Sequence, residues 1–184
     1  MNGQKRIVLF TDIGDTVIDE GTEIRDETGT VVHADCIPGA RETMRTLYGA
    51  GYVIVMVADG TVRSFANTMR ENGLEDIFAA RIISEAVGAE KPDGRMFRSA
   101  MDAVGLTDED RGRVVMVGNN VKRDIRGANL FGIRSVLLTW SKRRPFDEDG
   151  PEDHPDYTVS RPEELIPLLD KLEKELEKAE GSGE

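Results

Sequence analysis

Short apolar runs alternate with segments of helical periodicity along most of this chain. The runs are rich in valine and isoleucine, as buried strands are, and the segments between them carry apolar residues three and four positions apart. Strands that alternate with helices form βαβ units with right-handed crossovers. We therefore expect a Rossmann-like three-layer α/β sandwich with a central, mostly parallel sheet. The runs expected to be strands are residues 7–11, 52–57, 82–84, 113–118, 132–139 and 157–159.

A small β-hairpin flap is expected after the first strand. Residues 22–25 and 30–33 are strand-like, and the polar segment between them ends in Gly29. Helices are expected from about residue 40, over residues 62–71, and at the C-terminus from near Pro162. The length suits one domain, which we place at residues 1–180, followed by a disordered tail at residues 181–184.

The charge balance narrows the choice of partners. The formal net charge is −11, which argues against nucleic acid and against an anionic membrane surface. Cys36 is the only cysteine, so an intrachain disulfide is impossible and a reducing compartment is favoured. There is no signal peptide and no apolar run long enough to span a bilayer, so we expect a cytoplasmic location.

Polar side chains that could take part in catalysis or binding lie at the ends of the predicted strands. Asp12 follows the first strand, and the carboxyl ends of strands are where open α/β sheets bind ligands. Asp59 and Gly60 follow the second strand, and Asn119 follows the fourth, with Asp124 in the next helix. An aspartate in such a place is more often a turn former or a helix cap, so no single position decides the function.

Four of these segments together resemble the motifs of the haloacid dehalogenase superfamily. The first motif, Asp-x-Asp-x-Thr after an apolar strand, is matched by residues 12–16, and the second, a strand ending in Ser or Thr, by residues 53–58. The third, a lysine before a helix, is matched by Lys91, and the fourth, acids after a strand, by residues 118–124. The order of the motifs is that of the family, and they cover nearly the whole chain.

The resemblance implies a Mg²⁺-dependent phosphate hydrolase. In that family the first aspartate, here Asp12, attacks phosphorus and forms an aspartyl-phosphate that water hydrolyses. Lys91 would hold the nucleophile and the phosphoryl oxygens, and the phosphoryl charge must be neutralised for a carboxylate to attack. The implied metal ligands are Asp12, the carbonyl of Gly14, Asn119 and Asp124. The implied substrate-binding residues are Ala58, Asp59, Gly60 and Lys91.

Three positions depart from the family pattern. Gly14 stands where the phosphatases have a general acid/base, whose loss removes a contribution of roughly 10²–10⁴ in rate. Asp15 is adjacent, but neighbouring residues leave a turn in different directions. Ala58 replaces a phosphoryl-binding Ser or Thr, and Asn119 replaces a metal-binding acid. These departures predict slow turnover, or a preference for good leaving groups such as acyl phosphates.

Two other functions remain open at this point. One is a degenerate relative with a binding or assembly role, and the other is non-phosphomonoester chemistry of the dehalogenase or phosphonatase kind. The intervals between the motifs have no room for a cap domain, so the chain is similar to the capless type. An open site suits a larger substrate, or one that a second subunit of a homo-oligomer or the hairpin closes over. The expected partner is a phosphorylated small molecule or a larger phosphorylated substrate. The hairpin would be a mobile gate, and the basic segment 142–144 is expected in a solvated loop.

Overall fold

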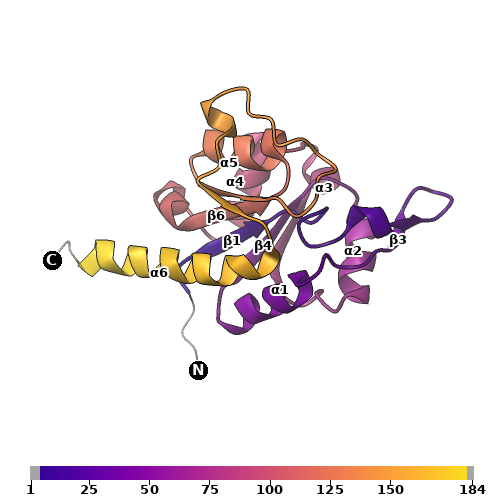
Figure 1. The fold of residues 1–184 in the computed structure, drawn as a ribbon, viewed down its shortest axis with the longest axis horizontal. Coiled ribbons are helices and arrows are strands. Elements are labelled where there is room, and N and C mark those ends of the chain that lie inside the picture. Colours follow the sequence, from indigo (N-terminus) through magenta and orange to yellow (C-terminus); the bar gives the residue numbers. More distant parts are fainter. Residues whose placement is uncertain (1–4, 182–184) are drawn as a thin grey trace.

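The computed structural model describes residues 5–181 and has a six-stranded sheet at its centre (Figure 1). The strand order is β5-β4-β1-β6-β7-β8, and every neighbouring pair is parallel. The predicted parallel sheet is therefore confirmed. The strands are β1 (Val8–Thr11), β4 (Val53–Ala58), β5 (Phe78–Ile83), β6 (Val114–Gly118), β7 (Arg134–Leu138) and β8 (Tyr157–Val159).

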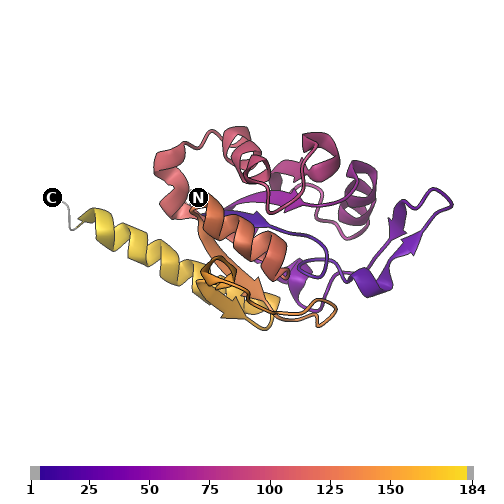
Figure 2. The same ribbon diagram turned by 90° about the horizontal axis from the view of Figure 1, so that it is seen from above.

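Helices cover both faces of this sheet and complete three layers (Figure 2). Strand β1 shows why, because its side chains alternate between the faces. Ile7 and Leu9 pack on one side, and Val8 and Phe10 pack on the other. The first side is covered by α1 (Ala40–Gly49), α2 (Val62–Glu71) and α6 (Leu165–Gly181), and the second by α4 (Gly94–Ala103) and α5 (Arg126–Phe131).

The predicted hairpin is present and projects from one end of the molecule (Figure 2). It consists of β2 (Ile24–Arg25) and β3 (Val31–His33), which pair antiparallel. Both strands are shorter than expected: β2 begins only at Ile24, because the chain first makes a 3-10 turn at Glu20–Thr22, and β3 begins at Val31. The Val31 amide donates to Ser64 Oγ at 3.0 Å, and Asn67 donates to the Val31 carbonyl at 2.9 Å, which ties β3 to α2.

Three expected elements differ in extent. Strand β5 begins before the expected residues 82–84. The sequence does not reveal its first half, because the side chains there are partly exposed and lack a continuous apolar pattern. Ser84 begins the short helix α3 (Ser84–Val87). The segment Val121–Ile125 is a π-helical turn before α5. Helix α6 continues to Gly181, and the remainder of the expected disordered tail, residues 182–184, lies outside the described residues.

The strand order places a crevice at the end of β1. From β1 the chain builds outward through β4 and β5 on one side, and then through β6, β7 and β8 on the other. Loops leaving β4 and β6 therefore diverge above the carboxyl end of β1, which is the point where open α/β sheets bind their ligands. Within residues 5–181, no helix is long and apolar enough to cross a membrane.

Candidate active site

Lys91 joins the ends of three neighbouring strands. Its Nζ lies 2.7 Å from Asp12 Oδ1, 2.7 Å from Asp124 Oδ1 and 2.8 Å from the Val57 carbonyl oxygen, to which it donates. Only 1% of the side chain is exposed. Burial alone would lower the pKa of Lys91, but the adjacent carboxylates raise it, so the buried ammonium stays charged. The motifs that the sequence singled out thus meet around one cation.

Asp12 has one carboxylate oxygen committed and one available. Its backbone amide donates to the Val117 carbonyl at 2.9 Å, so the residue continues the register of β1 with β6. Oδ1 accepts from Lys91, whereas among residues 5–181 only the Thr16 hydroxyl donates to Oδ2, at 3.4 Å. The side chain is 13% exposed and faces the pocket. The second oxygen is therefore free to act on a bound molecule.

Asp124 is buried beside Lys91, and its position depends on a glycine. Its side chain is 1% exposed, and its Oδ2 accepts the Asn120 amide at 3.0 Å. Burial raises the pKa of this carboxyl group, with Lys91 acting in the opposite direction. A Cβ at Gly118 would lie 2.2 Å from Asp124 Oδ2, so the carboxylate can fold over the end of β6 only because residue 118 has no side chain.

Asn119 contributes a buried amide with an unsatisfied donor. The residue is 2% exposed, and its Nδ2 has no hydrogen-bond partner among the described residues. Buried donors are almost always satisfied, so an unpaired one at the edge of a pocket indicates a place where a bound oxygen would be stabilised. The prediction that Asn119 belongs to the site is compatible with this position.

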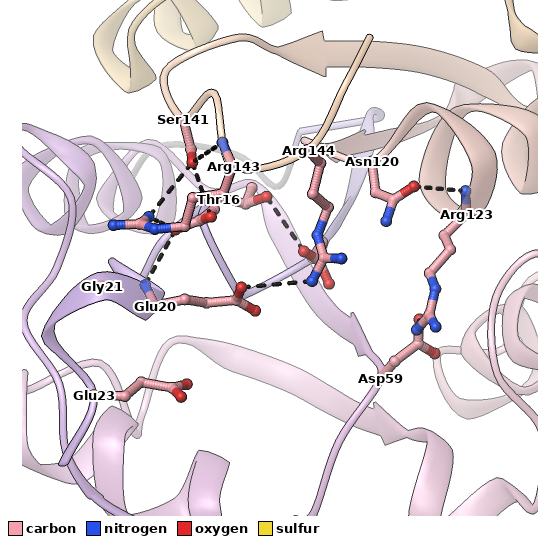
Figure 3. Close-up of polar contacts among 12 residues, drawn as sticks. Thr16, Glu20, Gly21, Glu23, Asp59, Asn120, Arg123, Ser141, Arg143 and Arg144 are labelled. Atoms are coloured by element: carbon pink, nitrogen blue, oxygen red, sulfur yellow. Dashed lines mark hydrogen bonds and ion pairs between the residues drawn. The ribbon is translucent and has the colours of Figure 1, made fainter. Parts of the chain in front are cut away.

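The residues after β4 have different surroundings from one another. Ala58 is fully buried and does not line the pocket. Asp59 accepts the Lys91 amide at 3.0 Å and the Arg123 guanidinium at 3.1 Å, so it connects two motif loops (Figure 3). Gly60 reaches the pocket, but its amide already donates to Ser84 Oγ at 2.9 Å.

Asp15 is turned away from the pocket into the protein. It is fully buried with φ of 51°, and its Oδ2 accepts the Ser141 hydroxyl at 2.9 Å. Arg143 contacts Asp15 Oδ1 and pairs with Asp19 at 2.6 Å. Segment 142–144 is exposed and forms no helix or strand, as the sequence predicted, and within it Arg143 also anchors the turn after β1 through ion pairs. Asp15 is consequently unable to replace a side chain at residue 14.

Sequence reasoning missed Glu20, which lines the pocket next to Asp12. Its Oε2 is 3.5 Å from an Arg144 guanidinium nitrogen, and Figure 3 shows the two side chains meeting. Burial raises the pKa of Glu20, and Asp15 adds to the shift while Arg144 opposes it. No spacing in the sequence marks this glutamate, because it enters the site only through the fold of the loop.

The pocket is small and strongly charged. It encloses about 170 Å³, which is below the range of roughly 300–1,000 Å³ for drug-sized ligands. Apolar wall is supplied by Ile13, Ile18, Val31 and Phe65. The ionisable side chains that line it are five carboxylates and four cations, namely Asp12, Glu20, Glu23, Asp59, Asp124, Arg25, Lys91, Arg123 and Arg144.

Comparison with known proteins identifies the family. The model of the haloacid dehalogenase-like hydrolases matches residues 3–132, which contain all four motifs. This chain belongs to that family. Among solved structures, this haloacid dehalogenase-like hydrolase is similar to the putative HAD-hydrolase YfnB of Bacillus subtilis. The TM-score is 0.72 at 18% identity, over 90% of this chain and 99% of that chain, and YfnB was crystallised with magnesium.

The curated relatives have more than one activity. A glyceraldehyde 3-phosphate phosphatase of Methanopyrus kandleri is 29% identical over 78% of this chain and 58% of its own length. A phosphoserine phosphatase of Thermus thermophilus is 37% identical over 59% of this chain and 41% of its own. An (S)-2-haloacid dehalogenase of Burkholderia cepacia is 28% identical over 73% of this chain and 55% of its own length. This hydrolase spans about half the length of the curated relatives that it matches.

Proposed function

We propose that this haloacid dehalogenase-like hydrolase is a Mg²⁺-dependent phosphatase of small phosphate esters or acyl phosphates. The observation that carries the proposal is the convergence of two carboxylates on Lys91, with Asp12 Oδ2 left free at the pocket. A buried ammonium beside a carboxylate holds the nucleophile in place and offsets the charge of an approaching phosphoryl group. The small pocket favours a small phosphorylated molecule over a phosphorylated macromolecule.

The charge of the pocket requires a cation for a phosphate ligand. Carboxylates outnumber cationic side chains in its lining, and Lys91 is already neutralised by Asp12 and Asp124. A dianionic phosphoryl group entering this environment without a cation would be repelled. The charge balance therefore supports a divalent metal ion as part of the working site.

The residues present fit magnesium. Asp12, Gly14, Asn119 and Asp124 all line the pocket, so two carboxylates, a backbone carbonyl and a side-chain amide would supply oxygen ligands there. No group of three or more His, Cys, Asp or Glu side chains in residues 5–181 forms a metal cluster. One or two carboxylates with water and substrate phosphate are the usual Mg²⁺ ligands. When bound, Mg²⁺ would neutralise phosphoryl charge as a Lewis acid.

The reaction assigned to these residues has two steps. Asp12 Oδ2 attacks phosphorus while Lys91 fixes Oδ1 and stabilises the phosphoryl oxygens. Water then hydrolyses the aspartyl-phosphate and releases inorganic phosphate. The Asn119 amide, which has no partner among the described residues, would donate to a phosphoryl oxygen or place its carbonyl on the metal ion.

The test is a panel of phosphate esters and acyl phosphates, assayed with Mg²⁺ and with a chelator, for the unaltered protein and Asp12→Asn. We expect release of phosphate that needs Mg²⁺ and that Asp12→Asn abolishes. Turnover that survives in Asp12→Asn contradicts the nucleophile. Metal-independent release of halide from a 2-haloacid would instead support dehalogenase chemistry. Absence of turnover together with absence of metal and beryllofluoride binding would support a binding role.

A further inference from the structure

The place that a side chain at residue 14 would occupy is already filled. A Cβ built on Gly14 would lie 2.2 Å from Glu20 Oε1, 2.9 Å from Cδ and 3.2 Å from Cγ. Gly14 is not among the residues of positive φ, so its backbone does not require glycine. The missing side chain leaves this space to the carboxyl group of Glu20, which would have to move if residue 14 were larger.

The fold of the loop brings Glu20 to this position. Ile18 forms a β-bridge with Gly14, so the chain doubles back on the turn that follows β1. The Glu20 amide then donates to Asp15 Oδ1 at 3.1 Å. Asp15 is itself fixed by Ser141 and Arg143, which come from the other end of the chain. The backbone of Glu20 is therefore fixed to a buried network, which sets where its side chain enters the pocket.

The two carboxylate oxygens of Glu20 have different surroundings. Oε2 faces Arg144 at 3.5 Å, which is longer than a hydrogen bond of ordinary strength. Oε1 is the atom nearest to Gly14, and no described residue donates a hydrogen bond to it. Glu20 and Asp12 line the same pocket. An unengaged carboxyl oxygen thus stands beside the nucleophile, at the position where the sequence lacks one.

We propose that Glu20 is a catalytic residue of this site, which contacts the leaving-group oxygen from the space left by Gly14. The inference rests on the proposed phosphatase function and names the group that serves its leaving group. The proposed role of Glu20 depends on the position of its carboxyl group. Substrates with different leaving groups test this role.

Glu20 gives up one proton in the first step and regains one in the second. As the bond between Asp12 Oδ2 and phosphorus forms, the bond between phosphorus and the leaving oxygen breaks, and that oxygen takes the proton of the Glu20 carboxyl group. In the second step water attacks phosphorus, the bond to Asp12 breaks, and the Glu20 carboxylate takes a proton from the water. Inorganic phosphate leaves, and both side chains return to their starting state.

The test compares leaving groups in variants of the full chain with Mg²⁺ present. Glycerol 3-phosphate has a poor leaving group that needs a proton, and p-nitrophenyl phosphate has a good one that does not. We expect Glu20→Gln to lower kcat for glycerol 3-phosphate by roughly 10²–10⁴ and to change kcat for p-nitrophenyl phosphate little. The matched control is Glu27→Gln, because Glu27 is exposed in the turn of the hairpin and does not line the pocket. It should leave the ratio of the two rates unaltered.

A relocated carboxyl group makes the test specific to the position. In Gly14→Asp/Glu20→Ala the new side chain has the space that Glu20 vacates, and we expect it to restore turnover of glycerol 3-phosphate relative to Glu20→Gln. An equal loss on both substrates in Glu20→Gln, or no loss on either, would overturn the role of Glu20. So would a folded double variant no more active than Glu20→Gln. Absence of turnover by the unaltered protein on both substrates would overturn the proposed function and this role with it.

Discussion

Replacing Lys91 by Met tests the electrostatic arrangement of the site. Met keeps the length of the side chain and removes the charge. In the structure the ammonium is 2.7 Å from a carboxylate oxygen of both Asp12 and Asp124, whose side chains are 13% and 1% exposed. Without the cation these two carboxylates would face each other, and the buried one would have lost its counter-ion.

The expected loss of stability follows from that burial. Removing one partner of a buried ion pair costs about 3–5 kcal/mol. Partial exposure of Asp12 gives some relief, so we expect the free energy of unfolding to fall by about 3 kcal/mol. For a chain of this size that corresponds to a Tm lower by about 6–12 °C.

The pH dependence distinguishes this cause from lost packing. In Lys91→Met, burial with no cation keeps the pKa of Asp124 above its unfolded value, so the folded state binds more protons than the unfolded state. Stability of the variant should therefore decrease as pH rises from about 5 to about 8. Urea unfolding of the wild type, Lys91→Met and Lys91→Met/Asp124→Asn without divalent cations measures this, and the double variant should recover part of the loss.

The reasoning is refuted by a small or pH-independent effect. A loss below about 1 kcal/mol would mean that the two carboxylates do not need the ammonium. An equal loss of stability at about pH 5 and about pH 8, not relieved by Asp124→Asn, would assign the effect to the packing of the lysine stem.

Three further predictions concern residues that support the site. Burial alone would raise the pKa of Asp153, but the Arg126 guanidinium beside it holds that pKa below its usual range. The stabilisation by the Asp153 carboxylate is present above about pH 4 and is lost as the pH falls below that value. In urea unfolding at neutral pH, Asp153→Asn should therefore lower the free energy of unfolding by about 2–3 kcal/mol, and it should weaken the fall in stability at acid pH. An unchanged fall in stability at acid pH contradicts this. Glu173 accepts the backbone amides of residues 6 and 7 at 2.8 and 3.0 Å, so Glu173→Gln should lower the free energy of unfolding by about 1–2 kcal/mol, and a Tm equal to that of the wild type contradicts it. Gly118→Ala should displace the Asp124 carboxylate and lower kcat. Full activity in that variant would contradict this, because it would mean that the loop of residues 119–124 can move to accommodate the added methyl group.

The central strands and the lysine were predictable from the sequence for physical reasons. β4 and β6 are buried on both faces, so their apolar runs are continuous, and Lys91 lies three residues before the amphipathic helix α4. Strand β5 forms an edge of the sheet with partly exposed side chains in its first half, so its sequence carries a weaker signal. The π-helical turn at residues 121–125 depends on tertiary contacts, which local propensity does not contain.

The contacts around the turn after β1 could not be predicted in the same way. Asp15 is fixed by Ser141 and Arg143, more than a hundred residues further along the chain. Glu20 reaches Gly14 only because the loop doubles back, and no periodicity records that path. The sequence showed that residue 14 lacks a carboxyl group, and the structure shows which residue fills its place.

The central claim, that Asp12 is the nucleophile, is tested most directly by trapping the covalent intermediate. The protein is mixed with Mg²⁺ and an acyl phosphate, quenched in acid during turnover, digested, and analysed by mass spectrometry. We predict one phosphoryl group on the peptide that contains Asp12, located on that residue by fragmentation and absent in Asp12→Asn. Steady release of phosphate with no adduct on that peptide, or with an adduct on another residue, would contradict the account.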